Sequence, residues 1–301
     1  MRVVSVLVTA LAVTALATAG NPPDPARTNV VFTGAGPCGI AARAGSIWVG
    51  VYGAGKLLQL DDRTGRREAS VTVGPWACRV AVGPAAVWVT RDRPGEVVRV
   101  SRGTGRLRRI QVGRGAFDVL LAGASAWTTS YDTGAIAKLE PSKGELVRVF
   151  KDGANPAGLT RCGGLIWVGH GGSSTWLSSI DPETNAITRV DVGIANPGWP
   201  RCIRGVLWVT ASDTLLKVNG SSGTVLARLR LGGTLAAVAE GPDALLWVTD
   251  KERSLVHRVW GGKPSLTDTF PAGPGAYSIV RAGDAMWITS FAGADVRRYE
   301  R

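Results

Sequence analysis

Short apolar runs, broken every few residues by Gly, Pro, Asp or Asn, follow one another along nearly the whole chain. The stretch SIWVGVYGAGKLLQLDDRTG, residues 46–65, shows the pattern: an apolar run, a glycine-rich break, a second alternating run and an Asp/Thr/Gly turn. Alternation of this kind is typical of β-strands joined by tight turns. No long stretch repeats apolar residues at helical spacing, so the pattern predicts a protein made almost entirely of strands.

A tryptophan inside an apolar strand returns along the chain at intervals of 40, 39, 40, 41, 39 and 40 residues. A repeat of this length with a fixed aromatic residue is typical of β-propeller blades, four-stranded sheets that pack face to face. We therefore predict an all-β, seven-bladed β-propeller with four-stranded blades, in which each tryptophan anchors the packing between blades. The seven residues are Trp48, Trp88, Trp127, Trp167, Trp208, Trp247 and Trp287.

Within the first unit the four strands read GIAARA, SIWVGV, KLLQLD and EASVTV, from the inside of the ring outward. The turns before the outermost strands recur as DDRTG, SRGTG, EPSKG, DPETN and NGSSG, in which Asp or Ser bonds the backbone and Gly or Asn accepts a positive φ. Forty glycines, 16 prolines and only 19% charged residues agree with a turn-rich β protein.

The last unit ends at Arg301 without a fourth strand, whereas TNVVFTGAG, residues 28–36, resembles an outermost strand that has lost its first three partners. Adding this strand to the last blade would remove an exposed sheet edge. We therefore predict that Asn29 to Thr33 pair with Val296 to Tyr299.

The four cysteines allow three pairings. Cys38 and Cys78 each stand ten residues before their tryptophan, at equivalent positions on adjacent blades. Cys162 and Cys202 stand five and six residues before theirs, also on adjacent blades but near the other end of the innermost strand. This placement favours the disulfides Cys38–Cys78 and Cys162–Cys202, each closing a loop of about 40 residues. Four buried free thiols are the alternative.

Residues 1–19 have the features of a signal peptide: Arg2, an apolar run from Val3 to Leu16, and the small residues Ala17-Thr18-Ala19. The run is shorter than the roughly 20 residues that cross a bilayer. We expect cleavage after Ala19, a propeller over residues 20–301 with no membrane span, and export to the extracellular, periplasmic or cell-wall space, where disulfides persist.

The formal net charge is +12 and falls by one when the signal peptide takes Arg2 away. The mature protein thus stays strongly basic, and we expect it to favour anionic surroundings such as cell-wall polymers or polyanionic ligands. Part of this charge forms a stripe, because most of the positions that follow each tryptophan by about eleven residues are basic. Nucleic acid is not expected, because the chain is exported and its basic residues are spread around the ring. The stripe consists of Gln59, Arg99, Lys138, Ser179, Lys217, Arg258 and Arg298.

The sequence GPCGI at residues 36–40, the seven tryptophan strands, and the segments EVVRV, AIAKL, LLKV and LVHRV carry a family pattern. With them the chain resembles the streptogramin B lyase (virginiamycin B lyase) family of seven-bladed propellers and their non-enzymatic YncE-like relatives. The resemblance covers essentially the whole mature chain. It implies the propeller fold, whereas propellers in general host many functions.

The lyases open a lactone with a histidine base beside glutamates that bind Mg²⁺, and the resemblance maps these residues onto other types here. The histidine corresponds to Tyr277, the two glutamates to Gly275 and Phe291, and a second histidine to Ala237. Tyrosine with its ordinary pKa near 10 is a poor base, and glycine and phenylalanine do not bind Mg²⁺. Lyase activity with that residue pattern is therefore not expected.

The ends of the second strands and the residues after them are expected to converge on one face of the ring, where polar and aromatic side chains form a mouth for a ligand. Ordinary solvated loops are the alternative. The candidate ligand-binding residues are Tyr52, Arg91, Tyr131, His170, Asp250 and Tyr277.

Two functions follow from these features. The first is a secreted, non-catalytic propeller that needs no cofactor and binds a small molecule, an anionic cell-envelope polymer or a protein partner. The second is a metal-dependent lyase or lactonase, in which His170, Asp250 and Tyr277 would perform the acid–base chemistry and Mg²⁺ would stabilise the anionic intermediate.

Overall fold

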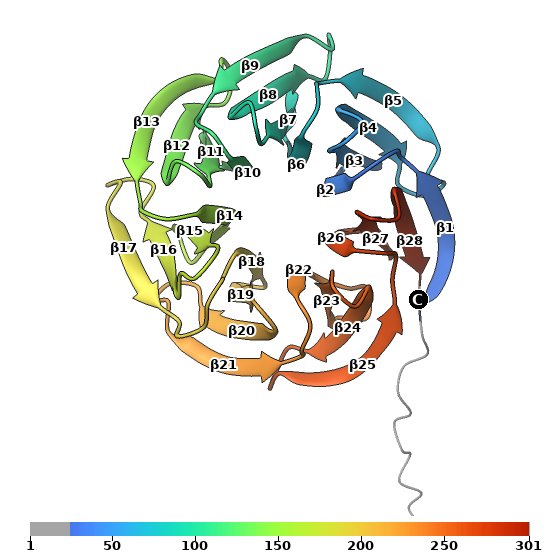
Figure 1. Ribbon diagram of the computed structural model, residues 1–301, viewed down its shortest axis with the longest axis vertical. Helices are drawn as coiled ribbons and strands as arrows, with labels where there is room; N and C mark the ends of the chain where they lie inside the picture. The colour runs from blue at the N-terminus through green and yellow to red at the C-terminus, as the bar shows by residue number, and fades with distance from the viewer. Residues whose placement is uncertain (1–24, 301) are drawn as a thin grey trace, which may run out of the picture.

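The computed structural model describes residues 25–300. Its 28 strands form seven four-stranded antiparallel sheets arranged as blades around a central axis (Figure 1). This confirms the seven-bladed β-propeller. The expected signal peptide, residues 1–19, lies outside the described residues, within which there is no helix able to span a membrane.

The strand bounds by blade are as follows. Blades 1 and 2 contain β2 (Pro37–Arg43), β3 (Ser46–Val51), β4 (Lys56–Asp61), β5 (Arg67–Thr72), β6 (Ala77–Val82), β7 (Ala86–Arg91), β8 (Glu96–Ser101) and β9 (Leu107–Gln111). Blades 3 and 4 contain β10 (Ala116–Ala122), β11 (Ser125–Ser130), β12 (Ala135–Glu140), β13 (Glu145–Lys151), β14 (Pro156–Cys162), β15 (Leu165–His170), β16 (Trp176–Ile180) and β17 (Ile187–Asp191). Blades 5 and 6 contain β18 (Trp199–Ile203), β19 (Val206–Ala211), β20 (Thr214–Asn219), β21 (Val225–Arg230), β22 (Leu235–Glu240), β23 (Leu246–Asp250), β24 (Leu255–Trp260) and β25 (Ser265–Pro271). Blade 7 contains β26 (Ala276–Ala282), β27 (Ala285–Ser290), β28 (Asp295–Glu300) and β1 (Ala26–Phe32).

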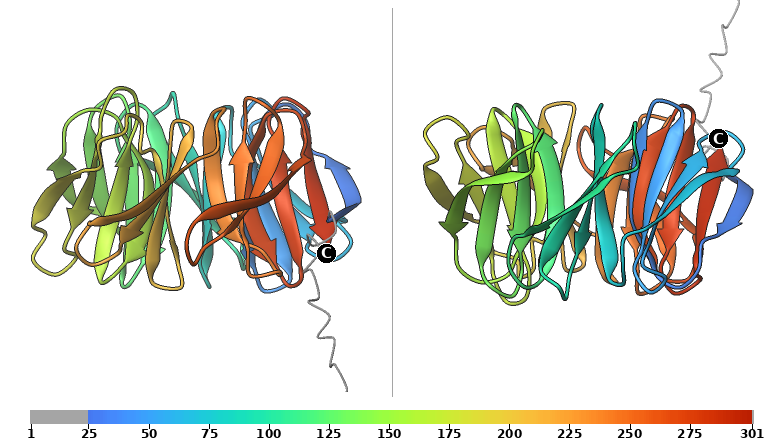
Figure 2. Two further views of the ribbon diagram at one scale, coloured as in Figure 1. Left: turned by 90° about the horizontal axis from the view of Figure 1, so that it is seen from below. Right: turned by 90° about the horizontal axis from the view of Figure 1, so that it is seen from above.

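The N-terminal strand completes the last blade, as the sequence predicts. β1 pairs antiparallel with β28 in the register Asn29 to Arg298 and Val31 to Val296. The pairing is longer than expected, because it continues to Ala26. The views along the plane of the ring show this strand on the outer side of a flat disc (Figure 2).

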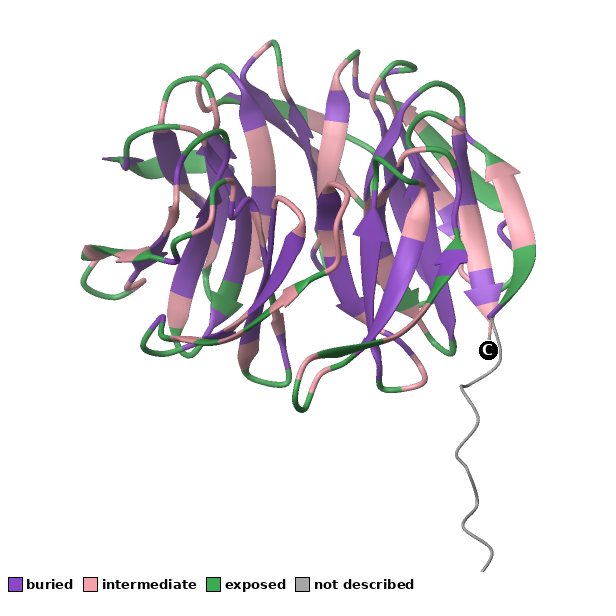
Figure 3. Cartoon of the chain, turned by 60° about the horizontal axis from the view of Figure 1, so that its bottom comes forward, coloured by how far each residue is buried: buried purple, intermediate pink, exposed green. Residues whose placement is uncertain are grey.

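The tryptophans lie between blades. Trp287 of blade 7, for example, is fully buried against Ile47, Val49 and Leu58 of blade 1. Its indole Nε1 also donates to the carbonyl oxygen of Asp62, in the turn before β5, at 3.2 Å. The Asp/Thr/Gly turn thus places a carbonyl where the neighbouring tryptophan needs an acceptor. Buried residues are concentrated in the strands between the faces of the disc (Figure 3).

Several side chains of the basic stripe bond the neighbouring blade. The Nζ of Lys138 donates to Pro182 O of the next blade at 2.9 Å and lies 5.1 Å from the centre of the Trp127 ring. The third strand of each blade has neighbours on both faces, so its long basic side chains lie between blades. Equivalent bonds join Arg99 to Pro141 O, Lys217 to Gly261 O and Arg298 to Asp62 O.

Two kinds of link join the inner parts of neighbouring blades. At five junctions a buried threonine, two residues after the blade tryptophan, donates its hydroxyl to a carbonyl at the start of the next inner strand. At the other two, glycine replaces threonine and a disulfide joins the blades. The threonine bonds are Thr90 to Phe117 O, Thr129 to Ala157 O, Thr210 to Ala236 O, Thr249 to Tyr277 O and Thr289 to Cys38 O.

The predicted disulfides Cys38–Cys78 and Cys162–Cys202 are both present. They join blades 1 and 2, and blades 4 and 5, where the threonine position is occupied by Gly50 and Gly169. A Cβ on Gly50 would lie 2.1 Å from Cys78 O, and one on Gly169 would lie 2.5 Å from Gly198 O. These two junctions are therefore too close for a threonine, and the covalent bond replaces its hydrogen bond.

Candidate functional site

A pocket of about 520 Å³ opens on the face of the ring where the inner strands begin. The loops after the second strands of blades 1, 2, 6 and 7 supply part of its lining. The rest comes from the first residues of inner strands β2, β6, β10 and β26 and from the residues just before β22 and β26. This arrangement follows from the repeat, because equivalent loops of every blade meet at the same face. The lining includes Tyr52, Asp92, Phe117, Lys251, Glu252, Tyr277 and Phe291.

A row of six aromatic rings borders this pocket and the channel beneath it. Neighbouring ring centres are 5.0 to 6.1 Å apart, within the range of favourable aromatic contacts. The rings fix one another, so the mouth presents a preformed apolar wall. In order, the row is Tyr52, Phe291, Tyr277, Trp199, Phe117 and Tyr131.

Polar groups stand at the rim of the apolar wall. The hydroxyl of Tyr52 donates to Asp92 Oδ2 at 2.8 Å. Burial, with the neighbouring Asp92 carboxylate, raises the pKa of Tyr52 to about 12. Glu252 accepts a hydrogen bond from the Thr234 hydroxyl at 2.6 Å, and Lys251 is exposed. Among the described residues that line the pocket, Lys251 therefore supplies a positive charge at the rim, and the carboxylates of Asp92 and Glu252 already have hydrogen-bond partners.

The structure divides the six candidate ligand-binding residues into two groups. Tyr52 and Tyr277 line the mouth pocket. Tyr131 ends the row of rings and lines an adjacent hollow beside blade 4. Arg91, His170 and Asp250 are buried inside the blades and do not line the mouth.

His170 is fully buried. Its Nδ1 lies 3.0 Å from Ala154 O, and its Nε2 lies 2.9 Å from Ser178 Oγ and 3.2 Å from Asp152 Oδ2. Burial alone would raise the pKa of the Asp152 carboxyl, but hydrogen bonds from His170 and Ser178 outweigh it and lower that pKa. This network fastens the loop before β14.

Arg91 and Asp250 have similar structural partners. Arg91 forms an ion pair with Glu96, and Asp250 forms one with Arg253. Burial opposes ionisation of Asp250, but the Arg253 guanidinium and backbone N–H groups lower its pKa overall. Both faces of a blade are covered by neighbours, so the last residue of a second strand is buried. Only the first loop residue, such as Tyr52, reaches the mouth.

The residues present do not fit a Mg²⁺ site of the lyase kind. Tyr277, Gly275 and Phe291 line the mouth pocket, and Ala237 lines the channel, so none of the four matched positions supplies a ligand. Within residues 25–300, no three His, Cys, Asp or Glu side chains come together in a metal-binding group. Mg²⁺ prefers several oxygen ligands in octahedral geometry.

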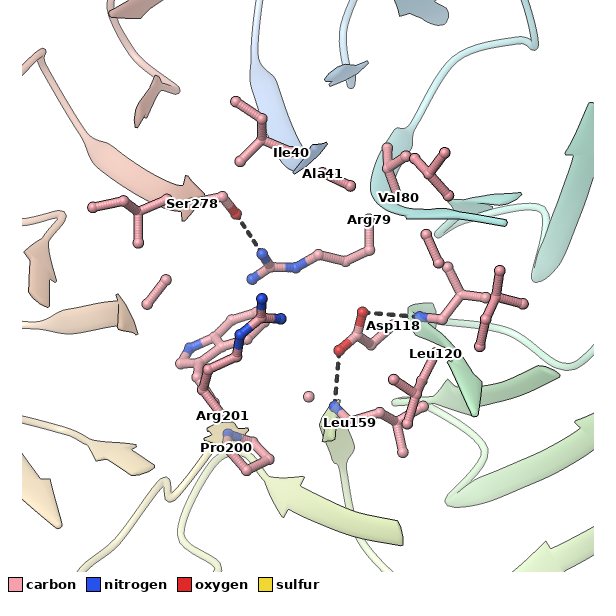
Figure 4. A pocket seen from close by; sticks show the side chains of 18 of the residues that line it. Ile40, Ala41, Arg79, Val80, Asp118, Leu120, Leu159, Pro200, Arg201 and Ser278 are labelled. Carbon is pink, nitrogen blue, oxygen red and sulfur yellow. Dashed lines mark hydrogen bonds between the residues drawn. The ribbon is translucent and has the colours of Figure 1, made fainter. Parts of the chain in front are cut away.

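Sequence reasoning missed a second group of polar residues, which lies in the central channel. This channel has a volume of about 270 Å³ and is lined by all seven inner strands. Figure 4 shows Arg79, Asp118 and Arg201 pointing into it from β6, β10 and β18. The position nine residues before each blade tryptophan lies on the inner strand. It is glycine or valine in three blades, but Arg79, Asp118, Trp199 and Ser278 in the other four. That contrast was the available signal.

The fold and the mouth define a seven-bladed β-propeller with a ligand-sized aromatic pocket on one face. A solved streptogramin B lyase matches with a TM-score of 0.77 and 15% identity, over 92% of this chain and 96% of that one. A catalytically inactive virginiamycin B lyase from Staphylococcus aureus with quinupristin matches with a TM-score of 0.80 and 15% identity, over 92% and 99%. BamB from Moraxella catarrhalis matches with a TM-score of 0.63 and 17% identity, over 90% and 83%.

At these identities the structural likeness establishes the fold and leaves the activity to the site residues. No protein-family model matches the chain, and no curated protein matches it at a significant level.

Proposed function

We propose that this protein is an exported, non-catalytic propeller that binds a small amphipathic molecule at its aromatic mouth. The observation that carries the proposal is the preformed pocket of about 520 Å³. Its volume lies within the range of about 300–1,000 Å³ that is usual for small-molecule sites. A mainly aromatic wall with a few polar groups at the rim is the usual composition of such sites.

Export is supported by two independent features. Residues 1–19 have the charge, apolar run and small residues of a signal peptide. The two disulfides fit an oxidising compartment, because thiols in the cytosol are kept reduced. An extracellular, periplasmic or cell-wall location agrees with both.

A non-catalytic role is supported by the chemistry of the rim. The hydroxyl of Tyr52, with a pKa of about 12, is protonated at neutral pH and serves as a hydrogen-bond donor to Asp92. The carboxylate of Glu252 is held by Thr234. None of these groups is arranged as a base beside an activated nucleophile.

The composition of the mouth indicates the kind of ligand. Tyr52, Tyr277 and Phe291 offer ring surfaces for an aromatic or other flat apolar group, and the exposed Lys251 offers a charge for an anionic or carbonyl substituent. Quinupristin, present with the virginiamycin B lyase neighbour, is a suitable probe. The naphthalene dye 8-anilinonaphthalene-1-sulfonate is a second probe, since it combines fused rings with an anion.

The test is a titration of the mature protein, residues 20–301, with each probe, followed by calorimetry and dye fluorescence. The variant Phe291→Ser removes one wall of the pocket at a side chain that is 40% exposed, so the fold should tolerate it. Phe32→Ser is the matched control, because Phe32 is 73% exposed on the outer strand, away from the mouth. We expect saturable binding to the mature protein and to the control, weakened about tenfold or more in Phe291→Ser.

Equal binding by the two variants, or no saturable binding of either probe, would show that the mouth is not the site. Mass spectrometry of the quinupristin samples, with and without Mg²⁺, tests the absence of catalysis. Conversion of the probe to a linear product that requires Tyr277 would overturn the non-catalytic assignment and restore the lyase alternative.

A further inference from the structure

The central channel contains more positive charge than its neighbours neutralise. Its polar residues are two arginines, one aspartate and one serine, and most of the remaining lining is aliphatic. Figure 4 shows Arg79, Arg201 and Asp118 converging on the middle of the ring from three different blades. A buried charge is unfavourable unless it is paired, so the partners of each group decide what the channel can hold.

Arg79 extends from β6 toward blade 7 and is held in position. Its Nη1 donates to the Ser278 hydroxyl, and its guanidinium carbon lies 3.9 Å from the centre of the Trp199 ring and 4.9 Å from that of Tyr277. Its Nε and Nη2 atoms are buried and have no hydrogen-bond partner within residues 25–300. Stacking satisfies the faces of the guanidinium but leaves these N–H groups, which point along its plane, unpaired.

Arg201 lies on β18 and projects into the space of the channel. Among the described residues its guanidinium has no hydrogen bond or ion pair. Arg201 is exposed to the open space of the channel. Desolvation by the blades around it lowers the pKa of Arg201, although the Asp118 charge opposes the effect. An arginine nevertheless stays charged in a protein.

Asp118 does not neutralise either arginine by direct contact. Its two carboxylate oxygens accept the backbone N–H groups of Val119 and Leu159, each at 2.8 Å, and so join blade 3 to blade 4. Burial raises the pKa of this carboxyl, against the influence of Arg79. Even with Asp118 ionised, two guanidinium groups face one carboxylate that already has its hydrogen bonds.

We propose that the channel binds a small oxyanion, a carboxylate or phosphate, between the guanidinium groups of Arg79 and Arg201. Arginine presents parallel N–H donors that match the oxygens of both groups. The volume of about 270 Å³ is many times the roughly 10–15 Å³ that one water molecule requires, so a compact organic acid fits. This site is distinct from the mouth pocket, since the two spaces share no lining residue: Phe117 and Tyr277 line the mouth, and Trp199 lines the channel.

The experiment titrates inorganic phosphate and acetate separately into the mature protein at constant ionic strength, with chloride replaced by the anion. Binding is followed by calorimetry and by the melting temperature. The test variant is Arg201→Met, which removes a side chain without protein partners and should leave the fold intact. Arg66→Met is the matched control, because Arg66 is exposed in the turn before β5.

We expect a saturable response in the mature protein and in Arg66→Met, and a dissociation constant at least tenfold higher in Arg201→Met. Without added anion, Arg201→Met should melt at the same temperature as the mature protein or higher, because it relieves an unpaired charge. The anion with the lower dissociation constant identifies the oxyanion chemistry of the site. A response no larger than that to chloride, or equal responses in the two variants, would overturn the proposal.

Quinupristin binding separates this proposal from the function assigned to the mouth. Arg201→Met should leave quinupristin binding unchanged, and Phe291→Ser should leave the response to phosphate and acetate unchanged. A loss of the anion response in Phe291→Ser equal to that in Arg201→Met would show that the channel has no oxyanion site of its own.

Discussion

Replacing Thr289 by valine removes one hydroxyl at the junction where the last blade meets the first. Thr289 is fully buried. Its Oγ1 donates to Cys38 O at 3.1 Å and accepts the backbone N–H of Ser278 at 2.9 Å. Valine has nearly the same shape, so the change deletes these two hydrogen bonds with little effect on packing.

Each buried backbone group left without a partner costs about 1–3 kcal/mol, so the valine variant, which leaves two, should lose roughly 2–6 kcal/mol of unfolding free energy. For a chain of this size, 1 kcal/mol corresponds to about 2 °C of melting temperature. The melting temperature should therefore fall by roughly 4–12 °C. Circular dichroism and urea denaturation of the mature protein measure both quantities.

Two further variants separate the hydroxyl from other effects of the substitution. Thr289→Ser keeps the hydroxyl and loses only a methyl group, worth about 1 kcal/mol, so it should be more stable than the valine variant. Thr188→Val makes the same substitution at an exposed position of β17 and should change stability by less than about 0.5 kcal/mol. If Thr289→Val and Thr188→Val melted at the same temperature, the threonine links would not be stabilising the ring.

The remaining predictions concern the other junctions, the buried histidine and the closing strand. Replacing Cys38 and Cys78 by alanine removes a disulfide with a sequence separation of 40 residues and should cost about 2–4 kcal/mol in urea denaturation; a loss of less than about 1 kcal/mol would contradict a stabilising role of this disulfide. Burial, and then the Arg253 charge, lower the pKa of His257, so the folded protein favours the neutral imidazole. The unfolded chain takes up a proton near pH 6.5, and the free energy of unfolding therefore declines as the pH falls below that value. His257→Gln should therefore flatten the decline of the urea midpoint between pH 7 and 5, and an unchanged slope would refute this. Deleting residues 20–34 should expose the edge of β28, lower the melting temperature and promote association seen by light scattering; an unchanged, monomeric variant would refute the role of β1.

The parts of the fold that repeat could be predicted from the sequence, because each blade buries the same positions. Trp48 and its equivalents mark the second strands. The position of the strand at Asn29 could be predicted because the last blade lacks a fourth strand, which leaves the edge of β28 without a partner. Cys38 and Cys78 could be paired because a repeat gives two residues the same place on neighbouring blades.

The site was harder to predict, because it depends on where single side chains point. His170 was expected at the mouth but lies between blades, since a blade is covered on both faces. Lys138 was predicted only as part of the basic stripe, and its bond to the next blade depends on the direction of its side chain. Arg79 and Arg201 went unnoticed because their strands read as ordinary apolar segments, and only the closed ring brings them together.

The strand that completes the last blade, β1, is synthesised before every other strand described above. β1 leaves the ribosome long before its partner β28, and under the export proposed above it also crosses the membrane first. The two strands pair in a register in which Ala26 is opposite Glu300 and Phe32 is opposite Asp295. Until β28 has been made, β1 has no partner, and β28 is also the last strand to appear. A chain cut short at any blade cannot close, and its unpaired edges remain open to proteases and to other chains. The ring can therefore close only after all seven blades, from β1 to β28, have been synthesised.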